Sequence, residues 1–148
     1  MIMKQNKILF KLIAAVFAFS MTAVFATPEL SAAGRTETEK ALKDFYVEYV
    51  TSMASDFSTF LKNREDMKNE YFSESFGRKY EETVENHGYD PLINAQDFAR
   101  ENIPTIKVES EGGRWYKVTY RDSYSNKPVE IHLKAKGRTG HLRLLDFK

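Results

Sequence analysis

The hydrophobic residues of this chain follow two different periods, and the change falls near residue 105. Beyond that point apolar and polar side chains alternate, as in Tyr116, Val118 and Tyr120 with polar neighbours between them. Before it, apolar residues recur in steps of one, three and four. Period two is typical of strands and the longer period is typical of helices. The order therefore predicts an α+β fold, in which N-terminal helices pack on a C-terminal antiparallel sheet.

Two helices are expected before the change in period. Thr36 and Glu39 have the spacing of a capping box at the start of the first. Weak helix formers at residues 51–58 indicate a break after it. The second helix is expected over residues 73–86, with Gly88 ending it in a left-handed turn. The first helix carries an apolar stripe on one face: Ala41, Leu42, Phe45, Tyr46, Tyr49, Val50 and Met53.

Strands are expected over residues 106–110, 114–121, 129–135 and 141–147. Opposed residues of an antiparallel pair share one face of the sheet, so aligning the apolar faces fixes the parity of the register. The simplest alignment of the second and third strands sets Val118 opposite Ile131, Tyr116 opposite Leu133 and Lys117 opposite His132.

The first 26 residues have the form of a Sec-type signal peptide, with three lysines, an apolar run and small residues at the end. Cleavage is expected after Ala26, with Ala33 as the alternative. The run is too short for a typical spanning helix, and no second apolar run of about 18 residues follows. Residues 27–38 are expected to form a flexible leader and residues 39–148 a single domain. We therefore expect a soluble exported protein, periplasmic or secreted, with no membrane attachment after cleavage.

The sequence contains no cysteine, which excludes disulfides and a lipid-modified N-terminal cysteine. Stability must then come from packing. Loss of the signal lysines leaves the mature chain with slightly more acidic than basic side chains. This balance does not favour nucleic acid or an anionic membrane as a partner.

No familiar catalytic or metal-binding motif occurs. His87, His132 and His141 lie more than four residues from one another, and no H-E-x-x-H sequence is present. His132 and His141 are able to approach each other across strands, but we interpret them as solvated side chains. Nucleophile-elbow and phosphate-loop patterns are absent from the sequence. We expect neither a metal nor a cofactor.

The most motif-like stretch is YDPLINAQDF, residues 89–98. Asp90 is a good helix N-cap, and Pro91 suits the first helical position. A short helix is then expected, ending before Pro104. Its apolar face is expected to consist of Leu92, Ala95 and Ala99. We interpret the stretch as a structural joint between helices and sheet, with a ligand-facing role for Asp97 or Asn94 as the alternative.

This stretch and its position resemble a known family. The eight residues from Asp90 to Asp97, and the sequence DFYVEYV at residues 44–50, are similar to the domain-of-unknown-function family 3828. The resemblance implies a small exported bacterial protein with a nuclear-transport-factor-2-like, or cystatin-like, fold, in which helices pack into the concave face of a curved sheet. It implies no established activity. The final HLRLLDFK departs from the Trp-Lys-Ile pattern expected of the last strand.

Aromatic residues supply the candidate binding surfaces. Trp115 falls on the outer face of the sheet beside Lys117 and Arg121. We interpret it as packing over lysine stems, with a contact patch for a protein, a glycan or a second copy of the chain as the alternative. Four other residues are expected to face the interior, where they either fill an aromatic core or line a ligand pocket: Tyr46, Tyr49, Tyr116 and Tyr120.

We expect an exported, non-catalytic binding or interaction module for an unknown protein or a small apolar ligand. Two alternatives stay open. The implied fold supports proton-transfer enzymes, and Asp97 is then the weak candidate for the catalytic base. Small exported domains also serve as immunity-type inhibitors of secreted toxins. An enzyme should place an acidic group deep in a tyrosine-lined cavity.

Overall fold

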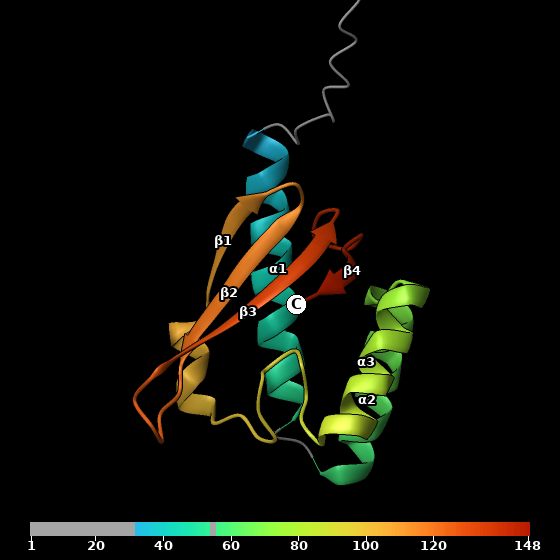
Figure 1. The fold of residues 1–148 in the computed structure, drawn as a ribbon, viewed down its shortest axis with the longest axis vertical. Coiled ribbons are helices and arrows are strands. Elements are labelled where there is room, and N and C mark those ends of the chain that lie inside the picture. The colour runs from blue at the N-terminus through green and yellow to red at the C-terminus, as the bar shows by residue number, and fades with distance from the viewer. Residues whose placement is uncertain (1–31, 54–55) are drawn as a thin grey trace, which may run out of the picture.

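The computed structural model describes residues 32–53 and 56–148 (Figure 1). Within these ranges the helices come first: α1 (Ala32–Ser52), α2 (Phe57–Tyr71) and α3 (Glu74–His87). A 3-10 helix, η1 (Arg100–Thr105), then leads into the strands β1 (Lys107–Gly112), β2 (Trp115–Arg121), β3 (Pro128–Lys136) and β4 (Arg143–Phe147). The predicted α+β fold is confirmed. The predicted signal peptide and its cleavage after Ala26 lie outside the described residues.

The strands form one antiparallel sheet in the order β1-β2-β3-β4. The predicted register is confirmed: Val118 pairs with Ile131, Tyr116 with Leu133 and Lys117 with His132. Alternation turns one face inward, and its residues on β2 and β3 are buried: Tyr116, Val118, Tyr120, Ile131, Leu133 and Ala135. A shift of one residue would turn the buried side chains of the shifted strand toward water, so burial fixes the parity of the register.

Helix α1 runs along the inner face of the sheet (Figure 1). The break predicted after it is confirmed, since α1 ends at Ser52 and α2 begins at Phe57. The stripe is also confirmed, with these members buried: Ala41, Leu42, Phe45, Tyr46, Tyr49 and Val50. The burial of three aromatic side chains from one helix explains why α1 is the centre of the core.

Helix α1 begins earlier than predicted. Residues 32–38 are helical, whereas the sequence indicated a flexible leader. Thr38 is buried, and its hydroxyl donates a hydrogen bond of 2.6 Å to the carbonyl of Gly137. This long-range contact anchors a segment whose small polar residues give no apolar periodicity. Helix α1 therefore extends into the segment that was expected to be a leader, and cleavage after Ala33 would fall inside its first turn.

The capping box predicted at Thr36 and Glu39 is not formed. The Thr36 hydroxyl donates 3.1 Å to the carbonyl of Ala32, one turn earlier, because the helix has already begun. The Glu39 carboxylate instead accepts a 2.9 Å hydrogen bond from the N–H of Ser110 on β1. Thr36 and Glu39 have side chains that suit a helix start. In this structure Thr36 lies inside the helix, and Glu39 connects the helix to the sheet.

Helix α3 agrees with the prediction for residues 73–86. The Ser73 hydroxyl accepts from the N–H of Phe76 at 3.3 Å as the N-cap. Gly88 ends the helix with a φ of 68°, and its N–H donates to the carbonyl of Val84. Both ends are therefore specified by local sequence.

Helix α2 was not one of the two helices predicted from the sequence. Asp56 caps it by accepting from the N–H of Thr59 at 3.1 Å. Among its described side chains only Met67 is buried, so α2 has no strong apolar stripe from which to predict it. Lys68 of α2 pairs with Glu81 of α3, which holds the two helices together. None of the helices in the described ranges is long and apolar enough to cross a membrane.

The crossover turn, residues 88–98, connects α3 to η1, and the short helix predicted here is wrong. The N–H of Asp90 donates to the carbonyl of Ala95 at 2.9 Å, and the N–H of Ile93 donates to the carbonyl of Asp90 at 3.2 Å. Asn94 has a φ of 50°, a left-handed conformation that stops a right-handed helix.

Contacts with the core hold the crossover turn in this shape. The hydroxyl of Tyr120 donates 2.7 Å to the carbonyl of Ile93, and the ring of Phe98 lies 4.7 Å from that of Tyr120 between centroids. The 3-10 helix η1 follows and contains Pro104, where the sequence predicted a helix that ends before it. The crossover turn thus connects the helices to the sheet, and tertiary contacts determine its shape more than helix propensity does.

Candidate functional site

The tyrosines predicted to bind a ligand all lie in the interior, and other aromatic rings pack against three of them: Tyr46, Tyr49 and Tyr120. Their exposed fractions lie between 0 and 4%. The ring of Phe45 contacts those of Tyr46 and Tyr49, each with a centroid separation of 5.6 Å. These tyrosines line none of the grooves between α1 and α2, between α2 and α3, or beside Gly137. The structure brings together, as an aromatic core, Tyr46, Tyr49, Tyr116 and Tyr120.

One carboxylate enters this core. The hydroxyl of Tyr49 donates to the carboxylate of Asp90 and lies 3.0 Å from the hydroxyl of Tyr80. The other oxygen of Asp90 accepts from the N–H of Leu92 at 2.8 Å. Arg64 of α2 lies over the Tyr80 ring, with 5.4 Å between its guanidinium carbon and the ring centroid. This polar cluster joins all three helices to the crossover turn.

Burial sets the ionisation of the cluster. Removal from water raises the pKa of Asp90, and hydrogen bonds from Tyr49 and Leu92 act in the opposite direction. Burial first, and then the charge of Asp90, raise the pKa values of Tyr46 and Tyr49 well above their usual range. The phenols therefore stay neutral near pH 7, and Asp90 is the group of the cluster that changes charge.

Asp97, the weak candidate for a catalytic base, is exposed. Its carboxylate accepts a 2.7 Å hydrogen bond from the backbone N–H of Phe98. Asn94 is exposed as well. Neither side chain meets the condition of an acidic or polar group deep in a tyrosine-lined cavity, and the partly buried carboxylate of this stretch belongs to Asp90. One feature of the sequence indicates that Asp90 is partly buried: apolar residues follow it directly.

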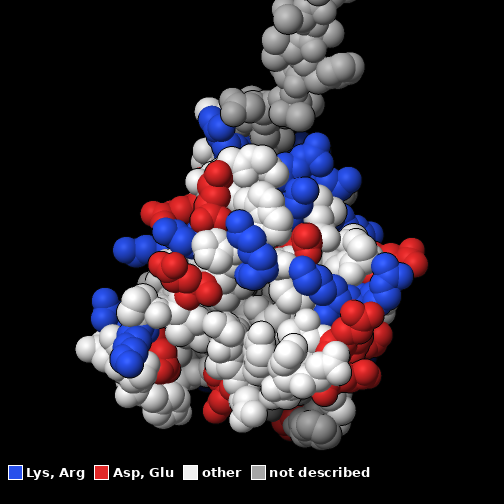
Figure 2. Space-filling view, in the orientation of Figure 1, with Lys and Arg blue, Asp and Glu red and all other residues white. Residues whose placement is uncertain are grey.

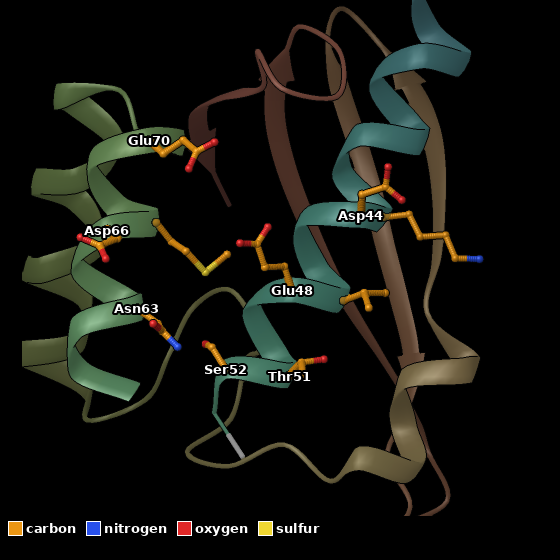
Figure 3. A pocket seen from close by; sticks show the side chains of 10 residues that line it. Asp44, Glu48, Thr51, Ser52, Asn63, Asp66 and Glu70 are labelled. Atoms are coloured by element: carbon orange, nitrogen blue, oxygen red, sulfur yellow. The ribbon is translucent and has the colours of Figure 1, made fainter. Parts of the chain in front are cut away.

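A groove of about 740 Å³ lies between α1 and α2 (Figure 3). Each helix lines it with two carboxylates one turn apart, Asp44 and Glu48 from α1 and Asp66 and Glu70 from α2. Figure 3 shows Glu48 and Glu70 directed into the space between the helices. The full lining is Lys43, Asp44, Val47, Glu48, Thr51, Ser52, Asn63, Asp66, Met67 and Glu70.

The groove combines negative charge with apolar surface. The hydroxyl of Tyr71 donates to Glu48 at 3.3 Å. Burial, and then the charges of Glu48 and Glu70, raise the pKa of Tyr71 to about 12. In the part of the chain that the structure describes, no basic side chain forms an ion pair with Glu48, Asp66 or Glu70. Met67 adds an apolar side chain to the lining. The site thus offers uncompensated carboxylates beside apolar contact.

The outer face of the sheet carries charges of both signs around Trp115. The ammonium groups of Lys148 and Lys134 lie 4.6 and 5.9 Å from the centroid of its ring. Trp115 is half-buried, in agreement with packing over lysine stems. Basic, acidic and uncharged side chains are interspersed over the face shown in Figure 2. A homodimer through the outer face stays a prediction.

The histidines do not converge. His132 contacts Glu111 at 2.8 Å, while His87 and His141 are exposed. Across the described ranges, no group of three or more histidine or acidic side chains is placed to hold a metal ion.

Comparison with known proteins supports the fold alone. No family model and no curated protein matches the chain. The chain is similar to a crystal structure, at 2.10 Å resolution, of a protein of unknown function from Bacteroides thetaiotaomicron VPI-5482. The identity is 23% and the TM-score 0.70, with 77% of this chain and 90% of that chain covered. This likeness shows a shared fold and carries no information on activity.

Proposed function

We propose that this protein is an exported, non-catalytic binding module that holds a basic segment of a partner protein in the groove between α1 and α2. The observation that carries the proposal is the pair Glu48 and Glu70. Their carboxylates point into one space from two helices, and no described basic side chain is paired with either.

The spacing of the carboxylates supports a segment with regularly placed cations. Asp44 and Glu48 are four residues apart on α1, as are Asp66 and Glu70 on α2. Residues at this spacing have Cβ atoms about 5–6 Å apart, and like charges on them destabilise a helix by a few tenths of a kcal/mol. Alternate side chains of an extended segment lie about 6.6–6.8 Å apart on one side. Asp44 is already paired with Lys40 at 3.7 Å. Two lysines or arginines two residues apart would therefore compensate Glu48, Asp66 and Glu70.

The rest of the structure favours a protein over a small apolar ligand. The four core tyrosines are at most 4% exposed, while the groove is open and lined in part by the exposed side chain of Val47. Lysine and arginine stems suit the contacts that Val47 and Met67 offer, because these stems are apolar beneath a charged end. A secreted toxin with such a segment is one partner of this class, so an immunity-type inhibitor is a special case of the proposal.

Export rests on the signal-peptide pattern of residues 1–26, and the nuclear-transport-factor-2-like assignment rests on the stretch from Asp90 to Asp97. Helices on one side of an antiparallel sheet support that assignment. N-terminal sequencing of the protein recovered from host cell fractions tests export. A mature chain beginning at Thr27 outside the cytoplasm supports it, and an uncleaved chain in the cytoplasm contradicts it.

Binding is tested by fluorescence anisotropy of a labelled peptide that alternates lysine and valine. Replacing Glu48 and Glu70 together by glutamine should weaken binding by about tenfold or more, because two charge-assisted contacts are lost. Replacing Glu82 and Glu85 by glutamine changes the net charge equally on an exposed part of α3, and should leave binding near that of the wild type. The proposal fails if the peptide does not bind, or if both double variants weaken binding equally.

A further inference from the structure

One side chain of the crossover turn, that of Asp90, bonds the turn to helix α1. The main-chain groups of Asp90 close the turn by bonding to Ala95 and Ile93. One oxygen of its carboxylate accepts from the N–H of Leu92 at 2.8 Å, and the other accepts from the hydroxyl of Tyr49 on α1. The same residue therefore shapes the turn and fastens it to the helices.

The groups that face Asp90 do not neutralise its charge. The cation that acts on it is Arg64 of α2, which lies over the ring of Tyr80 and forms no ion pair with Asp90 among the described residues. An unpaired carboxylate held away from water is costly, and a proton removes that cost. The other titratable groups facing it are phenols: Tyr46 and Tyr49 on α1, Tyr80 on α3 and Tyr120 on β2.

We propose that Asp90 is a proton-dependent fastener, which holds the crossover turn closed when its carboxyl is protonated and lets the turn open to water when it is ionised. The geometry accommodates the proton. It would sit on the oxygen that faces Tyr49 and donate to that hydroxyl, which in turn donates to the hydroxyl of Tyr80, 3.0 Å away. The N–H of Leu92 keeps its acceptor on the other oxygen.

Opening of the turn has a defined structural consequence. Leu92 and Ile93 are both 0% exposed, and both belong to the turn. Their release would expose apolar surface and free the Tyr120 hydroxyl, which donates to the carbonyl of Ile93. Asp90 does not line the groove between α1 and α2, so the proposal is independent of the proposed function.

The test is NMR spectroscopy of the wild-type mature protein across a pH series. The carboxyl carbon of Asp90 reports its titration, and amide exchange reports the protection of Asp90 and Ile93. The expected midpoint is above that of an unfolded aspartate. Protection should rise as pH falls through this midpoint, by up to about tenfold for each pH unit of the difference. An ordinary midpoint, or protection that does not change across it, overturns the proposal.

Asp90→Asn supplies a mimic of the protonated form. Its amide oxygen still accepts from Leu92 and its amide nitrogen donates to Tyr49, so the turn should be protected at every pH without a pH-dependent change. Glu82→Gln, at an exposed position on α3 outside the groove, should keep the wild-type dependence. A wild-type dependence in Asp90→Asn overturns the proposal. If this variant does not fold, the carboxyl titration of the wild type decides alone.

Discussion

The hydroxyl oxygens of Tyr49 and Tyr80 lie 3.0 Å apart and join α1 to α3 inside the core. Tyr49 also donates to Asp90, so its hydroxyl serves two partners. Tyr49→Phe should lower the free energy of unfolding by about 1–3 kcal/mol, because a buried acceptor is left without its donor. Urea denaturation followed by circular dichroism measures the loss.

Tyr46→Phe is the matched comparison, one turn away on the same helix. The Tyr46 hydroxyl is buried and has no hydrogen-bond partner among the described residues. Its removal takes away an unsatisfied polar group, so stability should be unchanged or should increase by up to about 1 kcal/mol. A loss as large as that of Tyr49→Phe would mean that this hydroxyl has a partner, and would contradict the assignment.

The inward face of the sheet should tolerate far less change than the outer face. Leu133 is 0% exposed and pairs with Tyr116, while Glu130 on the same strand is exposed. Leu133→Ala should cost about 2–5 kcal/mol of unfolding free energy, since it leaves a cavity in the core. Glu130→Ala should stay within about 0.5 kcal/mol. Equal costs in thermal or urea unfolding would contradict the assignment of the two faces.

Substitution of two glycines after β3 distinguishes two causes of destabilisation, backbone strain and steric contact. Gly137 has a φ of 111°, and an added Cβ would lie 2.1 Å from the backbone oxygen of His141. Gly140 has a φ of 79° with nothing near an added Cβ. Gly140→Ala should cost about 1–2 kcal/mol from conformation alone. Gly137→Ala should cost more, because two backbone segments must separate, and a smaller loss in urea unfolding would contradict this.

Stability should increase as pH falls from 7 into the mildly acidic range. The pKa of Asp90 is higher in the folded state, so folding takes up a proton, and stability is gained as pH falls through the raised pKa toward the unfolded value near 3.9. Below that value Asp122 and Asp146 act oppositely, since hydrogen bonds from Ser125 and Lys79 lower their pKa values. Urea midpoints across pH should pass through a maximum on the acidic side. A maximum at or above neutral pH would contradict this account.

The parts of the fold that the sequence predicted are those that burial alone decides. Val118 faces Ile131 because any odd shift would expose both apolar faces, and the stripe of α1 follows from the helical period. The start of α1 was not predictable in this way, because its first turns are held by the bond between Thr38 and Gly137, residues far apart in sequence.

The crossover turn and its carboxylate were mispredicted for the same reason. Asp90 and Pro91 suit a helix start, but Asn94 adopts a left-handed φ and the turn closes through contacts with Tyr49 and Tyr120. A helix N-cap is a sufficient local reason for an aspartate at position 90. The sequence therefore does not indicate that its carboxylate bonds to a buried side chain on α1. The groove was missed as well, because it depends on how α2 packs beside α1.

The last turn of α2 depends on a cation from the sheet. The guanidinium of Arg143 lies 3.2 Å from the carbonyl of Phe72 and 3.3 Å from that of Asn69, beside Glu70 of the groove. Arg143→Gln removes a positive charge from a helix C-terminus and should cost about 1–2 kcal/mol. Amide exchange should show lower protection in α2, and the lysine–valine peptide should bind less tightly because Glu70 is less well held. Arg138→Gln, an exposed site with the same charge change, should alter neither. Unchanged protection of α2 in Arg143→Gln would show that this cation does not hold the helix end.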